Sequence, residues 1–168
     1  KSASELVRMR TANALVADVL GALEVMVLPG VTTLDLDAVA ESLVRDGGAE
    51  PAFKGYRGFP ATVCASVNEE VVHGIPSKRP LKAGDIVSLD VGVLLDGFYG
   101  DSALTVPVGE ISVAAAKLLS VTEQSLERAI SAVRVGARVS DLGHAVQHYV
   151  EANGYSVVRA WRVFLQEK

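Results

Sequence analysis

The chain has 168 residues, of which 49% are apolar and 21% charged, a balance typical of a globular protein and not of a disordered one. Its net charge is −4 and its Lys and Arg residues are scattered, which excludes a basic surface for nucleic acid. The single cysteine, Cys64, excludes an internal disulfide, and no apolar run reaches the roughly 18 residues that span a membrane. We therefore expect a cytoplasmic protein that folds as a single domain over residues 1–168 and binds neither nucleic acid nor membranes.

The first part of the chain predicts two helices followed by a loop. From Ser4 onward, apolar residues recur at helical spacing, which indicates a long helix that ends before Pro29. Thr33 is the predicted N-cap of a second helix, which ends at the glycine pair 47–48. Residues 51–60 are rich in glycine, proline and aromatic side chains, so we expect a loop there.

The middle of the chain predicts strands. Residues 61–74 have the pattern of extended segments that lead into a glycine–proline turn. Residues 86–95 and 98–106 flank the dipeptide Asp96-Gly97, which is typical of two-residue hairpin turns. The sequence therefore predicts a β-hairpin with Asp96-Gly97 at its tip.

The last third predicts helices over residues 112–133 and 140–152 and a strand that begins at residues 155–158. An internal repeat links this part to the start of the chain, because the order of long helix, glycine turn, short helix and strand occurs twice. Five residues recur 106 positions later: Gly30, Asp35, Leu36, Val44 and Gly48 return as Gly136, Asp141, Leu142, Val150 and Gly154. This pattern indicates a duplication.

The predicted hairpin brings two carboxylates together. If Asp96 and Gly97 form the turn, the register places Asp101 opposite Gly92. Asp90 lies two residues from Gly92 and therefore points to the same face. Asp90 and Asp101 are then diagonal neighbours, with backbones about 7–8 Å apart.

Two carboxylates that converge on an apolar strand repel each other, and a divalent cation relieves that repulsion. Carboxylates shared by two metal ions can support a bridging water that becomes hydroxide-like near neutral pH. The alternative is structural, with Asp101 capping the strand beside Gly100 and Asp90 half exposed. From the spacing alone, both interpretations stay open.

Three segments carry a resemblance to a known family. SVNEEVVHGIP, LKAGDIVSLDVGV and DGFYGDSALTVPVG occur in the order and nearly the spacing of type I methionine aminopeptidases. The resemblance extends from the first helix through GYSVVR. It implies an α+β pita-bread (creatinase/aminopeptidase-like) fold, in which two pseudo-symmetric halves form a curved antiparallel sheet with helices outside.

The resemblance also implies an activity, which is removal of N-terminal methionine from nascent polypeptides by a hydroxide that two divalent metal ions activate. The metal could be Mn, Co, Fe or Zn. Asp90 and Asp101 match two metal ligands of the family, and His73 matches a histidine that hydrogen-bonds the substrate near the scissile bond. Tyr56, Phe59 and Cys64 match the methionine pocket, where a soft thioether suits aromatic and sulfur neighbours. For these last three residues, core packing is the alternative.

Two histidine and two glutamate ligands of the family find no match, so we expect a chain that lacks the C-terminal strands, leaves the second half of the fold incomplete and is catalytically crippled on its own. His144 and His148 lie on the predicted fourth helix, where such a pair could bind zinc weakly but not replace those ligands. Two other functions stay open. One is an X-Pro-type peptidase of the same fold, and the other is a pita-bread binding module without catalysis.

Overall fold

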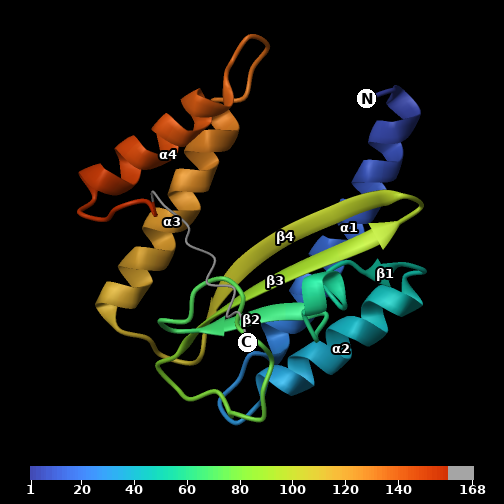
Figure 1. The fold of residues 1–168 in the computed structure, drawn as a ribbon. Coiled ribbons are helices and arrows are strands. Elements are labelled where there is room, and N and C mark those ends of the chain that lie inside the picture. Colours follow the sequence, from blue (N-terminus) through green and yellow to red (C-terminus); the bar gives the residue numbers. More distant parts are fainter. Residues whose placement is uncertain (159–168) are drawn as a thin grey trace. The chain divides into compact units, whose positions relative to one another are not determined.

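The structure is a computed structural model that describes residues 1–158 (Figure 1). The chain forms two compact units, Lys1–Ser112 and Val113–Lys168. Within the described residues the first unit contains two long helices and a sheet, and the second contains two helices. None of the described helices is long and apolar enough to cross a lipid bilayer.

Helix α1 (Ala3–Met26) begins at a capping box, as its first residues dictate. The Ser2 hydroxyl accepts a hydrogen bond from the Glu5 backbone N–H at 3.2 Å, and the Glu5 carboxylate accepts one from the Ser2 backbone N–H at 2.6 Å. The helix ends before Pro29, as expected. Its inner face is buried through Ala12, Val16, Val19, Leu20 and Leu23.

Helix α2 (Thr33–Asp46) begins one residue earlier than the sequence predicted, because its N-cap is Thr32 and not Thr33. The Thr32 hydroxyl accepts from the Asp35 backbone N–H at 3.1 Å and completes a capping box. Thr33 is instead buried, and its hydroxyl accepts from the Ser77 backbone N–H at 2.9 Å. Thr33 thus ties a distant loop to the start of the helix.

The sheet of the first unit is antiparallel, and in the described part of the chain it has four strands. They are β1 (Glu50–Pro51), β2 (Val63–Val67), β3 (Ile86–Leu95) and β4 (Phe98–Pro107). Strand β3 is central, with β1 and β2 on one side and β4 on the other. Helix α1 packs against β3 and β4, and α2 packs against α1, β1 and β2 (Figure 1).

The β3–β4 hairpin has the predicted tip and the predicted register. Asp96 and Gly97 both have positive φ, 49° and 79°, as a two-residue turn that follows the strand twist requires. Gly92 pairs with Asp101. The hairpin prediction is therefore confirmed to the residue.

The extended stretch predicted for residues 61–74 is only partly correct. Strand β2 covers Val63–Val67 and then stops at Asn68, which has a φ of 56°. The Asn68 side-chain amide donates to Asp85 at 2.8 Å, and its side-chain oxygen accepts from the Ile86 backbone N–H at 3.0 Å. These bonds turn the chain out of the sheet, because they satisfy polar groups that a continuing strand would pair.

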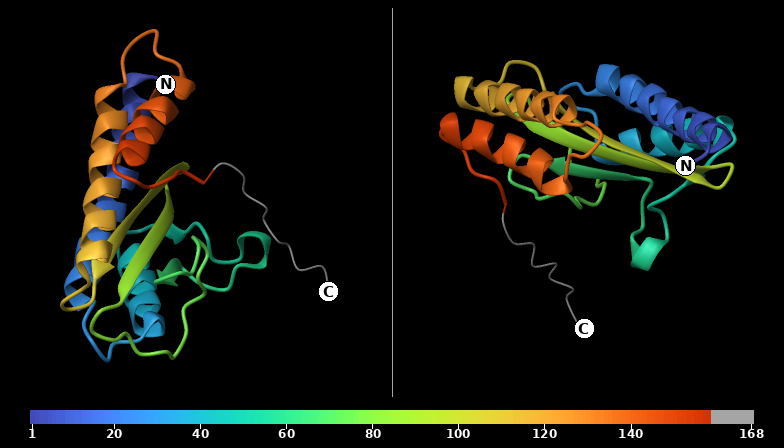
Figure 2. Two further views of the ribbon diagram at one scale, coloured as in Figure 1. Left: turned by 90° about the vertical axis from the view of Figure 1, so that its left-hand side faces the viewer. Right: turned by 90° about the horizontal axis from the view of Figure 1, so that it is seen from above.

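In the second unit, α3 (Val113–Ser131) and α4 (Val139–Ala152) lie side by side, as Figures 1 and 2 show. Both helices match their predicted ranges to within two residues. The strand expected at residues 155–158 is absent there, since these four residues adopt no regular structure. The Tyr155 backbone N–H instead donates to the Val150 carbonyl at 2.9 Å.

The predicted repeat holds in three dimensions. Helices α2 and α4 have bounds offset by 106 residues at both ends. The Ala49 N–H donates to Val44 O at 3.1 Å, and the equivalent bond joins Tyr155 to Val150 at 2.9 Å. The four glycines that bracket the two helices all have positive φ: Gly30 93°, Gly48 74°, Gly136 88° and Gly154 85°.

Candidate metal centre on the β3–β4 hairpin

Alternation along β3 sorts its side chains onto two faces of the sheet. Four residues on the helix side are fully buried, namely Val87, Leu89, Val91 and Val93. Asp90 and Gly92 point to the opposite face. Since Asp101 pairs with Gly92, its side chain joins Asp90 on that face. The predicted convergence of two carboxylates is therefore what the strand register produces.

An aromatic ring lies directly over Gly92. A Cβ on Gly92 would lie 2.5 Å from Cε1 of Phe53, closer than carbon atoms pack. Gly100 meets a backbone in the same way, since a Cβ there would lie 2.6 Å from the Ala12 carbonyl oxygen of α1. These two glycines let an aromatic side chain and a helix approach the strands next to Asp101.

The Asp90 carboxyl is electrostatically strained. It is half-buried, and its Oδ1 has no hydrogen-bond partner among the described groups. Burial, the charge of Asp101 and a hydrogen bond with Asp101 raise the pKa of Asp90 to about 6, whereas nearby His73 acts in the opposite direction. At neutral pH the hairpin thus holds two carboxylates whose charges are not compensated.

Cys64 lies beside Asp90 on the same face of the sheet. It faces Asp90 across the β2–β3 ladder and is 5% exposed. Burial, together with the charges of Asp90, Asp101 and Asp37, raises the pKa of the Cys64 thiol to about 12. The side chain therefore remains a neutral thiol at physiological pH, which suits an apolar wall and not a nucleophile.

His73 lies in the irregular segment after β2, and its neighbour Gly74 fixes that segment to the strand. The Gly74 carbonyl accepts from the Ala65 backbone N–H at 2.9 Å, and the Gly74 N–H donates to the Ser66 hydroxyl at 3.0 Å. A Cβ on Gly74 would overlap the Ala65 carbonyl oxygen, so only glycine allows this approach. The exposed His73 ring is thereby presented on the aspartate side of the sheet.

A cavity of about 380 Å³ adjoins the hairpin. Its lining residues come from β3, β4 and the loop after β1: Ala52, Phe53, Tyr56, Gly92, Tyr99, Gly100 and Asp101. Tyr56, a predicted pocket residue, is among them. Cys64 lies against Asp90 instead, and Phe59 is half-buried at the end of a short 3-10 helix (Tyr56–Gly58). The cavity therefore joins one predicted pocket residue to one predicted metal ligand.

The sequence reasoning missed Phe53 and Tyr99. Tyr99 could have been predicted, since it lies two residues before Asp101 on the same strand and hence on the same face. Phe53 was harder to predict from the sequence. A glycine in a strand often marks a close neighbour, but Gly92 does not say which residue fills the space above it.

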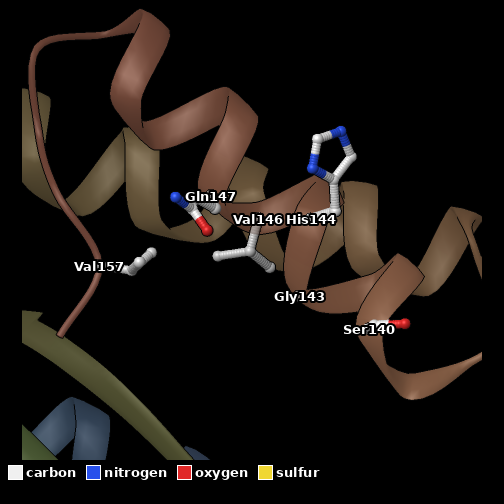
Figure 3. A pocket seen from close by; sticks show the side chains of 6 residues that line it. All are labelled: Ser140, Gly143, His144, Val146, Gln147 and Val157. Carbon is white, nitrogen blue, oxygen red and sulfur yellow. The ribbon is translucent and has the colours of Figure 1, made fainter. Parts of the chain in front are cut away.

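A second hollow, of about 540 Å³, lies on α4 in the other unit (Figure 3). Its lining residues are Ser140, Gly143, His144, Val146, Gln147 and Val157. It contains no carboxylate and only one imidazole, so it lacks the ligand density of the hairpin face.

The hairpin face fits a divalent cation. A buried carboxylate oxygen without a partner and a second carboxylate beside it are the environment that a hard cation neutralises. Over residues 1–158, no group of three or more His, Cys, Asp or Glu side chains gathers. Asp90 and Asp101 are therefore the ligand candidates on this face among the described residues.

Comparison with known proteins identifies the family of the chain. The model of metallopeptidase family M24 matches residues 7–164. The chain belongs to this family. Methionine aminopeptidase from Clostridium acetobutylicum is 49% identical over 160 residues, and methionine aminopeptidase 1 from Bacillus subtilis is 48% identical over 161 residues. These matches cover 95% and 96% of this chain but 64% and 65% of the relatives, so the chain spans just under two thirds of their length.

Solved structures show the same fold. Methionine aminopeptidase from Rickettsia prowazekii superposes with a TM-score of 0.94 at 40% identity, over 96% of this chain and 65% of that one. Prolidase from Pyrococcus furiosus, at 22% identity, shares the fold with a TM-score of 0.83 over 92% of this chain and 44% of that one. The expected α+β pita-bread fold of the M24 metallopeptidases is thus confirmed.

Proposed function

We propose that this chain acts in the metal-dependent removal of N-terminal methionine from nascent polypeptides in the cytoplasm. The observation that carries the proposal is the uncompensated Asp90–Asp101 pair, of which Asp101 lines an aromatic cavity. The identity of 45–49% to several proteins named methionine aminopeptidase supports the choice of substrate.

Asp90 and Asp101 are the proposed ligands of two divalent ions, for which Mn, Co, Fe or Zn are the candidates. Bound there, such ions would supply a Lewis acid and lower the pKa of a water. The carboxylates contribute negative charge and fixed positions, because both are anchored on a paired hairpin. A ligand held on strands keeps its geometry better than one held on a loop.

The cavity is the proposed site for the methionine side chain. Phe53, Tyr56 and Tyr99 provide flat apolar surfaces, and Asp101 lies at the same cavity. An unbranched thioether packs well against aromatic rings. The un-ionised Cys64 thiol and the half-buried Phe59 are proposed to complete the wall.

His73 is the proposed hydrogen-bond partner of the peptide backbone near the scissile bond. Its imidazole is exposed on the aspartate side, and the Gly74 bonds to Ala65 and Ser66 limit its movement. A positioned donor of this kind stabilises the charge that develops on a carbonyl oxygen during hydrolysis.

The test is release of methionine from a Met-Ala peptide by the 168-residue chain with added Mn²⁺ or Co²⁺. We expect slow metal-dependent release, because Asp90 and Asp101 alone hold an ion weakly, and Asp101→Asn should abolish it, because the variant loses one of these two ligands. An X-Pro peptide serves as the competing substrate, and methionine aminopeptidase 1 of Bacillus subtilis serves as the positive control.

Calorimetric titration with Mn²⁺ separates binding from turnover. Heat of binding that disappears in Asp90→Asn and Asp101→Asn supports the metal site independently of activity. Absence of methionine release while the positive control works would refute the proposed activity of this chain. Equal binding by all three chains would refute the proposed ligands.

A further inference from the structure

We propose that His144 and His148 form a separate site for a divalent ion of the Zn²⁺, Ni²⁺ and Cu²⁺ group on the outward face of α4. The proposed peptidase chemistry uses neither residue. The two side chains are exposed, and their ring centroids lie 6.0 Å apart with the rings 24° from parallel. Two imidazoles are thus held together on one regular element.

The helix fixes this spacing. Residues four apart lie one above the other on the same helix face, and two histidines at this spacing are a known way to bind zinc on a helix. An imidazole nitrogen binds zinc at about 2.0–2.1 Å, so small side-chain rotations suffice for both rings to reach one ion. Helix α4 runs without a break from Val139 to Ala152, so the backbone at both histidines is already ordered.

The repeat indicates which face of α4 stays open to solvent. His144 and His148 correspond, 106 residues earlier, to Ala38 and Ser42 of α2, and both of these are exposed although α2 is packed against strands. Val146 corresponds to Ala40, which is fully buried. Figure 3 shows the His144 ring on the side of the helix turned away from Val146. The two positions that the histidines occupy are therefore exposed in both copies of the motif.

Ligand chemistry separates this site from the hairpin. Imidazole nitrogen suits Zn²⁺, Ni²⁺ and Cu²⁺, whereas carboxylate oxygen suits harder ions such as Mn²⁺. Glu151, on the same face, accepts a hydrogen bond from Gln147 at 2.8 Å. Water is expected to fill the remaining coordination positions, so binding should be weaker than at a site with three or four protein ligands.

The test uses the full 168-residue chain with Asp90→Asn and Asp101→Asn, which removes the hairpin carboxylates from the measurement. Calorimetric titration with NiCl₂ should still show one ion bound per chain. Adding His148→Asn or His144→Asn should weaken that binding by about tenfold or more, because each leaves a single imidazole. The matched control is His73→Asn, which removes a histidine outside α4 and should change the affinity less than twofold.

Electron paramagnetic resonance of added Cu²⁺ identifies the ligands directly. We expect hyperfine coupling to the nitrogens of two imidazoles. In His148→Asn, coupling to only one imidazole should remain. Circular dichroism of each variant checks that α4 remains helical. Nickel binding that survives both single substitutions, or a copper spectrum without imidazole nitrogen, would overturn the proposal. Neither readout depends on methionine release, so this site and the proposed peptidase activity can fail separately.

Discussion

Helices α1 and α3 occupy equivalent places in the repeat but differ in what covers them. Leu20 of α1 is 4% exposed against the sheet, whereas Leu126, its counterpart in α3, is 59% exposed. Val27 and Val133 differ in the same way, at 4% and 64%. Burial of equivalent helix positions therefore follows from the strands that pack against the helix.

The largest expected effect is a matched pair of leucine substitutions that tests this difference. Leu20→Ala should lower the free energy of unfolding by about 2–5 kcal/mol, because it opens a cavity between α1 and the sheet. Leu126→Ala should change it by less than about 0.5 kcal/mol. Native-state hydrogen exchange of α1 and α3 amides measures each helix separately. A loss at Leu126 as large as at Leu20 would mean that α3 is covered in solution.

A second effect concerns Asp90, which makes the stability of the first unit depend on pH. Its pKa is raised from 3.8 to about 6, so between these values the folded state holds a proton that the unfolded chain has lost. Stability should therefore fall as pH rises from about 4 to 6 and stay lower above that range. Asp90→Asn should remove this fall and stabilise the metal-free chain at pH 7 by about 1–3 kcal/mol.

Urea unfolding of both chains in EDTA from pH 4 to 7.5 measures this effect. Hydrogen exchange of the amides in the α3–α4 unit serves as the internal reference. Parallel pH profiles for the two chains would show that Asp90 is not strained by burial and by Asp101. Replacing EDTA with Mn²⁺ should reduce the difference in stability between the two chains, since the ion compensates the same charges.

Several features of the fold could be predicted from the sequence alone. The hairpin register followed from the Asp96-Gly97 turn, because strand alternation leaves no freedom once the tip is fixed. The 106-residue repeat followed from five identities and predicted the equivalent helix ends. The N-cap of α2 was misplaced by one residue, since Thr32 and Thr33 are both plausible caps and only Thr33 has a distant partner, Ser77.

The site was harder to predict than the fold. Asp90 and Asp101 lie close in sequence, so local geometry was sufficient to bring them together. Phe53 reaches Gly92 through the β1–β3 pairing and a loop, and nothing in the local sequence fixes that contact. The strand predicted at residues 155–158 failed because a strand depends on a partner and not on its own composition.

A smaller effect should appear in both copies. Asp35→Ala and Asp141→Ala each remove a carboxylate that accepts from the N-cap backbone N–H, at 3.0 Å from Thr32 and 2.8 Å from Arg138. We expect a several-fold loss of amide protection in the first turn of α2 and of α4. Hydrogen exchange detected by NMR measures both. A loss confined to α2 would contradict the view that the caps act locally.

The smallest expected effect is a gain in stability, and it tests whether the two units respond alike when packing is not involved. Gly21 in α1 and Gly143 in α4 lie inside helices, and a Cβ at either position would meet no atom within 4 Å. Gly21→Ala and Gly143→Ala should each stabilise their helix by about 0.5–1 kcal/mol, because alanine loses less backbone entropy than glycine. Gly74→Ala is the contrasting control, since its Cβ would overlap the Ala65 carbonyl oxygen and should displace the His73 segment. Equal gains in stability at positions 21 and 143 would mean that the two copies differ in helix burial only because of the strands. A loss of stability at position 143 would show that other atoms pack against α4 around Gly143 in solution.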